Sequence, residues 1–396
     1  METLKDRDAG TPPALSPHMS SNVRHLCRLE TPGGGQVVVQ GKYAFIGHMK
    51  NPQGTTIMDI SDPRKPKVVS IVPVSDLNTH SHKVRVVGDL MFVNAEHQPG
   101  GCSRKDYADG GWRIYDIKDK ASPKLLSYVK THGKGVHRFD VDENYAYMSS
   151  EMEGFVGNIL VIYDIRNPSK PMEVGRWWMP GQNVAAGEPP HPKKAAHRLH
   201  HGLRYQDKIY AGCWFSGVAI IDVTDIANPK TLSHYEYDPP CPEPSHTLLR
   251  VPFQIGGRDI AVSTEEERKT RGPDTGKPHA PFRTWDVSDP TNPKILNTYH
   301  VDESRSPYHG DHIRFGAHQL RERVDEDMLV YVTWFAAGLR ILDIADPAAP
   351  RERGFFIPKP GDGYDAPQTN DVTMDERGLI LMTDKAKGFD IIEFSK

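Results

Sequence analysis

The chain has 396 residues, of which 37% are hydrophobic and 26% charged, a composition typical of a globular protein that buries a core. The formal net charge of −3 argues against a nucleic-acid backbone as the main partner. No segment approaches the run of about 18 apolar residues that a membrane-spanning helix needs, so no membrane partner is expected.

The N-terminal segment, residues 1–22, lacks the apolar stretch of a signal peptide and is predicted to be a disordered tail, followed by one folded domain over 23–396. The four cysteines are far apart and show no paired metal-binding spacing; they are Cys27, Cys102, Cys213 and Cys241. Such cysteines favour reduced thiols and a cytoplasmic location. Metal binding would therefore depend on histidine, of which there are 19.

One phrase recurs along the chain: alternating apolar residues, an Asp, and then Asp or Asn before a Pro. It occupies residues 55–67, 112–124, 160–172, 218–230, 282–294 and 339–351, and a short last copy occupies 388–396. The alternation predicts a strand, and the Asp- and Pro-containing end predicts a turn. The repeated aspartates are too regular to be catalytic and are expected to form turns; they are Asp59, Asp116, Asp164, Asp222, Asp286, Asp343 and Asp390.

Each repeat unit contains more strands than the phrase itself. Two alternating segments precede it, as in residues 82–96, and one short strand follows it, as in residues 67–72. Four antiparallel strands form the blade of a β-propeller. The last unit stops after its third strand, whereas residues 23–30 form a strand without a unit of its own. We therefore predict an all-β, seven-bladed β-propeller of four-stranded antiparallel blades, with its ring closed by the N-terminal strand.

The phrases LVIYDIRNPSKP, VAIIDVTDIANP and LRILDIADPAAP resemble the LVIVD repeat. The resemblance extends from about residue 23 to residue 396. It implies a propeller but no particular activity, because a fold of this kind carries many functions.

Aligned on their first strands, the units share a column that is rich in histidine. Its histidines are His82, His137, His201, His246 and His318, and Asn370 occupies the column in the last unit. The first strand of a propeller blade lines the central channel, so these side chains are expected to converge at one end. Imidazoles from several strands can bind one metal ion at about 2.0–2.2 Å. Two questions stay open: which three or four bind, and whether the column merely lines the channel.

Carboxylates are expected directly behind this column. Glu96, Glu151 and Glu265 end the second strands of three units, where each would accept an imidazole N–H and fix the tautomer. His80 lies two residues before His82 and is expected on the same side of the strand. His200, next to His201, is expected to point away into the packing of its blade.

Four further residues are candidates for binding a substrate, together with His80 and Asn370. Arg198 and Arg314 would hold a carboxylate or phosphate, or form ordinary ion pairs. Trp214 and Phe215 follow a second strand and would form either an apolar pocket or packing between blades.

These features predict a metal-dependent enzyme that acts on a small organic substrate. The site is similar in arrangement, without alignable sequence, to three groups: the carotenoid-cleavage oxygenases with iron, the selenium-binding-protein and methanethiol-oxidase group with copper, and the oligogalacturonate lyases with manganese. An almost all-imidazole ligand set favours non-haem iron and an oxidoreductase. Manganese or zinc would instead act as a Lewis acid in a lyase, isomerase or hydrolase. A non-enzymatic interaction platform is the remaining alternative.

Overall fold

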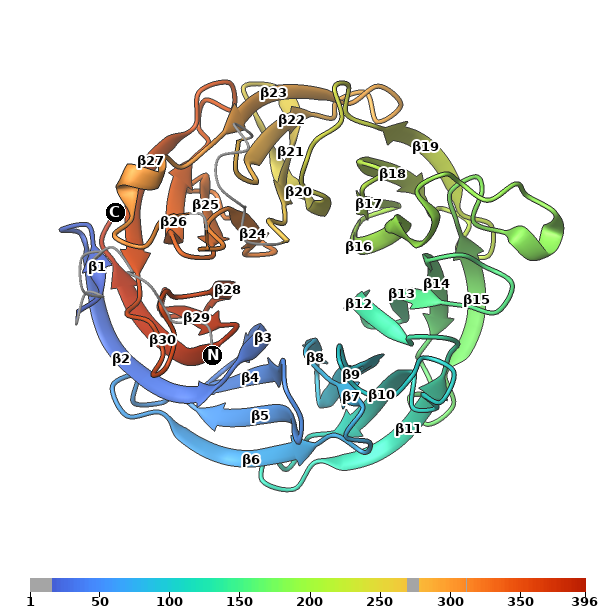
Figure 1. Cartoon of the computed structure of the whole chain (residues 1–396), viewed down its shortest axis with the longest axis horizontal. Helices are drawn as coiled ribbons and strands as arrows, with labels where there is room; N and C mark the ends of the chain where they lie inside the picture. Colours follow the sequence, from blue (N-terminus) through green and yellow to red (C-terminus); the bar gives the residue numbers. More distant parts are fainter. Residues whose placement is uncertain (1–15, 269–277, 311) are drawn as a thin grey trace, which may run out of the picture.

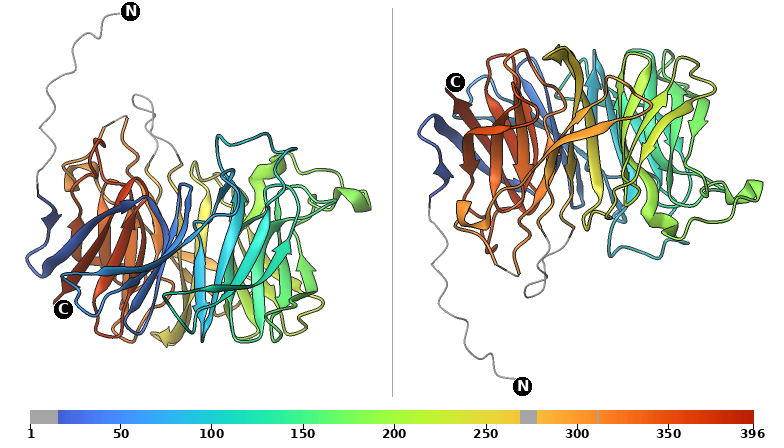
Figure 2. Two further views of the ribbon diagram at one scale, coloured as in Figure 1. Left: turned by 90° about the horizontal axis from the view of Figure 1, so that it is seen from below. Right: turned by 90° about the horizontal axis from the view of Figure 1, so that it is seen from above.

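The computed structural model describes residues 16–268, 278–310 and 312–396. Strands dominate these residues, and the helical elements among them are three short 3-10 turns: η1 (Val184–Ala186), η2 (Lys194–Ala196) and η3 (Glu303–Arg305). Within the described part, none of the helical elements has the length and apolar character needed to cross a membrane. The blades stand side by side in a ring (Figure 1), and their strands run between its two faces (Figure 2).

The strands group into antiparallel blades in chain order. The first half of the ring contains β3 (Gly34–Gln40), β4 (Tyr43–His48), β5 (Gln53–Asp59) and β6 (Lys67–Pro73); then β7 (Thr79–His80), β8 (Val84–Val87), β9 (Leu90–His97), β10 (Gly111–Asp116) and β11 (Lys124–Lys130); then β12 (Val136–Val141), β13 (Tyr145–Glu151), β14 (Asn158–Asp164) and β15 (Met172–Trp177).

The second half continues in the same way. It contains β16 (His197–Tyr205), β17 (Lys208–Trp214), β18 (Val218–Asp222) and β19 (Lys230–Tyr235); then β20 (Ser245–Ile255), β21 (Arg258–Glu265), β22 (Phe282–Asp286) and β23 (Lys294–Tyr299); then β24 (Ala317–Leu320), β25 (Leu329–Trp334), β26 (Gly338–Asp343) and β27 (Arg351–Ile357); and last β28 (Thr369–Met374), β29 (Ile380–Asp384), β30 (Lys387–Phe394) and β2 (Val23–Pro32).

The N-terminal strand closes the propeller, as the sequence predicts. Strand β2 pairs antiparallel with β30, from Val23 opposite Phe394 to Pro32 opposite Lys387. The ordered chain begins earlier than the predicted boundary at residue 23, because β1 (His18–Met19) pairs with β27. Residues 1–15 of the predicted tail lie outside the described residues.

The repeated aspartate makes the expected turn in most units. Oδ1 of Asp59 accepts the backbone N–H of Ser61 at 2.8 Å, two residues further along the chain. The same bond recurs at Asp116, Asp164, Asp222, Asp286 and Asp343. Asp390 differs, because its buried carboxylate binds Arg28 and His25 of β2 instead. The last aspartate of the series therefore ties the two ends of the chain together.

Apolar clusters between neighbouring blades stabilise the ring. One such cluster joins Phe92 and Trp112 with Phe139 and Met148 of the next blade, and all four side chains are at most 1% exposed. The first strand of each blade lies nearest the central axis; these strands are β3, β8, β12, β16, β20, β24 and β28 (Figure 1). Residues on these strands can therefore meet across the axis, although they are far apart in the sequence.

Candidate metal centre

Seven histidines line one cavity of about 270 Å³ near the central axis, and all of them except His97 lie in one arc. We call these six the histidine arc: His80, His82, His137, His200, His246 and His318. Neighbouring imidazole centroids along this arc are 4.2, 5.2, 4.6, 4.3 and 4.4 Å apart. Five consecutive blades contribute side chains, so the arc forms only when these blades pack side by side around the axis.

Hydrogen bonds at Nδ1 determine the tautomer of four of these histidines. Nδ1 of His200 donates to the carbonyl oxygen of His246 at 2.9 Å, and Nδ1 of His318 donates to that of Asn370 at 2.5 Å. A carbonyl oxygen only accepts, so Nδ1 carries the proton in both. Nδ1 of His137 likewise donates to the Glu96 carboxylate at 2.7 Å.

The fourth is His246, whose Nδ1 lies 2.9 Å from the Thr247 hydroxyl. That hydroxyl donates its own proton to Gln319, so it accepts from His246. Nε2 of His246 in turn accepts from the Arg138 guanidinium at 3.3 Å. All four histidines therefore present Nε2 as a lone pair, which is the form that binds a metal ion.

Two of these lone pairs meet. Nε2 of His137 lies 2.9 Å from Nε2 of His200. With both protons on Nδ1, neither atom can donate to the other, and the two lone pairs repel unless they share a cation. Two ligands bound at about 2.0–2.1 Å and at right angles on one ion are about 2.8–3.0 Å apart. The observed spacing matches that of neighbouring ligands on a single metal ion.

Burial lowers the pKa of five histidines of the arc and so favours their neutral form: His82, His137, His200, His246 and His318. It lowers the pKa of His137 to about 4, in spite of the opposing effect of Glu96. It also lowers the pKa of His200 well below the ordinary value, and the charges of His137 and Arg198 add to this effect. Neutral imidazoles are the protonation state that metal coordination requires.

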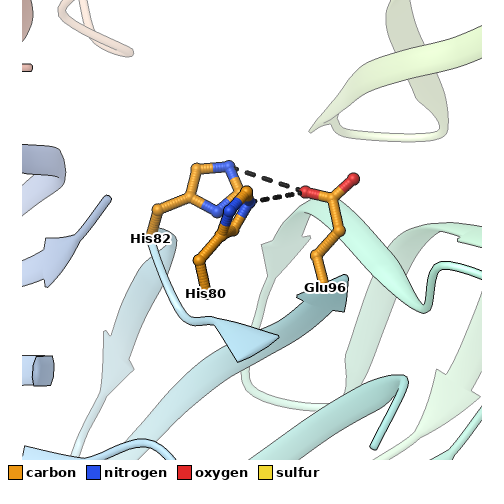
Figure 3. Close-up of side chains that lie close together, drawn as sticks. All are labelled: His80, His82 and Glu96. Carbon is orange, nitrogen blue, oxygen red and sulfur yellow. Dashed lines mark hydrogen bonds and ion pairs between the residues drawn. The ribbon is translucent and has the colours of Figure 1, made fainter. Parts of the chain in front are cut away.

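Glu96 connects three histidines at one end of the arc, and Figure 3 shows it with two of them, His80 and His82. Its Oε2 accepts from Nε2 of His80 at 3.1 Å and from Nδ1 of His137 at 2.7 Å, and it lies 3.9 Å from Nε2 of His82. Burial would raise the pKa of Glu96, but these imidazoles hold it well below its usual range. An ionised carboxylate thus orients His137, as predicted from the sequence.

A second carboxylate faces the other end of the arc. Glu266 lies 4.0 Å from Nε2 of His246 and 4.0 Å from Nε2 of His318, and it binds the Arg314 guanidinium. Burial would raise its pKa, but His318, Arg314 and Lys385 outweigh burial and lower it. Two sets of possible ligand atoms lie within 4.8 Å of one another: His80, His82 and Glu96, and His200, His246 and Glu266.

The structure corrects the predicted positions of two histidines, His200 and His201. His82, His137, His246 and His318 line the cavity as expected, but His200 lines it in place of His201. The prediction that His200 points into the blade packing is wrong. His201 is fully buried in the channel, with Nδ1 3.1 Å from the Thr247 hydroxyl and Nε2 3.7 Å from Glu322.

The cause is a β-bulge of unusual size in β16. In β12, Val136 pairs with Ser150 and Phe139 with Met148, which inserts one extra residue. In β16, His197 pairs with Trp214 and His201 with Gly212, which inserts two. Each inserted residue exchanges the two faces of a strand. The additional one brings His200 to the axis.

The sequence held a signal for this exchange. The turn between β16 and β17 begins at Gln206, whose φ of 55° matches the 56° of Gly88 in the turn between β8 and β9. Counting six residues back from Gly88 reaches His82, and the same count from Gln206 reaches His200. Left-handed backbone is uncommon for a residue other than glycine, so the turn position was not recognised.

Two of the three predicted carboxylates have other partners. Glu151 binds Arg104 and the backbone N–H of Lys134, and Glu265 binds Tyr237 and Arg283. In the part of the chain that the structure describes, neither contacts the histidine arc. Strand β21 ends at Glu265, and beyond it the chain turns Glu266 toward the cavity. Strand periodicity does not extend past that end, which explains why Glu266 was missed.

The remaining predicted residues lie around the arc. Trp214 stacks on His200 with centroids 4.7 Å apart, and Arg198 lies 4.5 Å from the Trp214 ring. Phe215 packs edge-on against Trp214. Asn370 lines the cavity, but its amide donates to the carbonyls of Gly34 and Gly35. Substrate contacts by these residues stay predictions, as they do for His80 and Arg314.

The structure also places three lysines that were not predicted in the cavity wall, Lys83, Lys134 and Lys385. Burial lowers the pKa of Lys83 to about 7 and that of Lys385 to about 8. Hydropathy assigns lysine to the surface, so no sequence pattern marked them as part of a site.

Glu96→Gln is expected to weaken metal retention about 10–100-fold, because the amide presents its NH₂ group as well as its carbonyl to His137 and no longer fixes the tautomer. The measurement is the metal dissociation constant from a competition titration with a coloured chelator. Glu151→Gln is the matched control, since Glu151 contacts Arg104 and not the arc. Equal losses in both variants would contradict the orienting role of Glu96.

Comparisons with known proteins agree with the fold. The LVIVD repeat model matches residues 34–74, 136–178 and 329–356. The chain is thus a β-propeller built with LVIVD repeats. Comparison with curated proteins gives no match.

Several solved propeller structures are similar. The periplasmic gluconolactonase PpgL of Pseudomonas aeruginosa has a TM-score of 0.59 at 15% identity, over 86% of this chain and 88% of that one. The Cps50 (Swd1) propeller domain of Myceliophteria thermophila has 0.57 at 12%, over 94% and 100%. The C-terminal WD40 domain of Sif2 has 0.57 at 10%, over 94% and 99%. At these identities the likeness concerns the fold alone.

Proposed function

We propose that the histidine arc binds a divalent transition metal ion and that the protein is a metal-dependent enzyme acting on a small organic substrate in the adjoining cavity. The observation that carries this proposal is the 2.9 Å contact between Nε2 of His137 and Nε2 of His200, both of which are lone pairs. His246 and His318 supply two more such nitrogens on the same arc. His82 differs, because its Nδ1 accepts from Asn94 at 3.3 Å.

The residues of this chain have separate tasks in the proposed site. Glu96 and the backbone carbonyls hold the imidazoles in one orientation, so little reorganisation is needed when a metal ion binds. Trp214 covers His200 and limits the access of water. Glu266 is ionised and faces His246 and His318, so its negative charge can offset that of a bound metal ion.

Iron is the favoured metal, since four neutral imidazoles with a carboxylate behind them leave positions free for oxygen and substrate. Bound iron would supply electron-transfer and oxygen chemistry, which makes an oxidoreductase the first candidate. A Lewis-acid lyase, isomerase or hydrolase is the second, because Glu266 offers an oxygen ligand of the kind that manganese and zinc accept. All four cysteines are free, which supports the cytoplasmic location that we propose.

Metal analysis tests the proposal. The full chain, purified without a histidine tag and without chelators, is expected to contain about one equivalent of iron, manganese, zinc or copper by plasma mass spectrometry. The identity of the metal then separates the two candidate reaction classes. A protein that contains no metal and takes up none when titrated with all four ions would contradict the enzyme proposal and favour an interaction platform.

A further inference from the structure

The cavity next to the histidine arc carries more positive than negative charge. Glu96 and Glu266 are its carboxylates, and the imidazoles and Arg314 already bind them. Lys83, Lys385 and the adjoining Arg198 are three basic side chains at this cavity, in addition to Lys134, which is exposed. Within the described ranges, none of these three has a carboxylate oxygen within 4.0 Å.

Lys83 is the most enclosed of the three. Its residue is 3% exposed, and its backbone N–H donates to Asn94 at 2.9 Å, which fixes the strand that carries it. An ammonium group is costly to bury without a partner. Asp371 and Glu266 attract this charge, but neither has an oxygen within 4.0 Å of it, so an anion that enters the cavity would be its first direct partner.

Lys385 approaches the same space from another blade. It follows β29, and its ammonium lies 6.0 Å from the Phe335 ring, which offers only a weak interaction at that distance. The charges of Lys83 and Lys385 repel each other, and both act on His318. Two lysines from separate blades thus line the same cavity.

Arg198 adds a planar group near the middle of the arc, beside His200. Its guanidinium stacks on Trp214, which itself stacks on His200, and it has no hydrogen bond to a carboxylate among the described residues. A stacked guanidinium keeps its N–H donors free at the edge, where they match the two oxygens of a carboxylate.

We propose that the substrate of this site is a small organic carboxylate, whose negative charge is held by Lys83 and Lys385, with Arg198 nearby beside Trp214 and His200. Calling this anion a substrate rests on the proposed function, because it assumes that the protein is an enzyme. The binding of the anion itself does not depend on the metal. A divalent ion on the arc would increase the positive charge and strengthen the preference. The cavity volume of about 270 Å³ lies just below the range of about 300–1,000 Å³ typical of drug-sized ligands, so the molecule is small.

Calorimetric titration of the full chain tests this inference with matched acid and amide pairs. The probes are acetate, succinate and benzoate against acetamide, succinamide and benzamide. At least one acid is expected to bind about tenfold or more tightly than its amide, because a buried charged hydrogen bond is lost in the amide. Lys385→Met and Lys83→Met are each expected to weaken binding of that acid about 10–100-fold.

Lys124→Met is the matched control, because Lys124 is an exposed residue of the outer strand β11. It is expected to bind the acid as the unchanged protein does. Circular dichroism checks that each variant is folded, and Lys385→Met provides the test if Lys83→Met does not fold. The inference is overturned if no acid binds more tightly than its amide, or if neither lysine variant weakens binding.

Repeating the titration after chelator treatment separates this inference from the proposed function. Acid binding that persists without metal and disappears in Lys385→Met supports the cationic site itself. A protein that contains metal but prefers no acid would overturn the carboxylate inference and leave the metal proposal standing. A protein that binds acids but never binds metal would overturn the metal proposal and leave the carboxylate inference standing.

Discussion

His200→Ala is expected to lower the metal affinity of the protein about 100-fold or more, whereas His201→Ala leaves it nearly unchanged. Nε2 of His200 is a lone pair 2.9 Å from Nε2 of His137, and its loss removes a direct ligand. Such a loss exceeds the 10–100-fold typical of residues that only orient a ligand. The measurement is metal content by plasma mass spectrometry, together with a chelator competition titration.

The two variants control for each other. Both side chains are at most 1% exposed, and both substitutions remove one imidazole from the same strand. They differ only in which face of β16 the side chain occupies. Equal metal loss in the two variants, or loss in His201→Ala alone, would contradict the assignment of His200 as the metal ligand from β16.

Arg28→Leu is expected to lower the free energy of unfolding by about 3–5 kcal/mol, the usual cost of leaving a buried charge without its partner. Arg28 is bound to Asp390 by an ion pair at 2.5 Å, and the side chains are 6% and 2% exposed. The same guanidinium donates to the Lys387 carbonyl at 2.9 Å. Because β2 and β30 come from opposite ends of the chain, the substitution weakens the strand pair that closes the ring.

Arg24→Leu is the matched control on the same strand. Arg24 pairs with Glu393 across the same two strands, but these side chains are 61% and 42% exposed. An exposed pair of this kind is worth about 0–1 kcal/mol. Urea titration of both variants gives the comparison. A similar small effect from both substitutions would mean that the Arg28 ion pair contributes little to closing the propeller.

The recurring phrase accounts for how much of the fold could be predicted. Alternating apolar residues predict strands, and an Asp that accepts the N–H two residues later predicts the turn, as Asp59 and Asp116 show. Both signals are local, so they survive in any tertiary context. The closing strand was predictable for a similar reason, because an incomplete last unit leaves β30 with a free edge that only residues near 23–30 could cover.

The cavity-lining histidines could be predicted only in blades whose first two strands pair in the same register. His82, His137 and His318 lie two residues before the pairs Val84–Val93, Phe139–Met148 and Leu320–Val332, which are equivalent in their blades. In β16 the equivalent pair is Gly202–Ala211, and the residue two before it is His200. A strand has a period of two, so one inserted residue reverses which side chain reaches the axis.

The sequence by itself determined the propeller, its closure and the presence of a histidine column, because these depend on local alternation and on repetition. Only the tertiary structure decided that His200 replaces His201, that Glu266 faces the arc, and that Lys83 and Lys385 share its cavity. These outcomes depend on bulges, on strand ends and on the meeting of blades across the axis. Apart from the turn at Gln206, none of them is marked in the local sequence pattern, so the chemistry of the site is defined only when the blades pack around the axis.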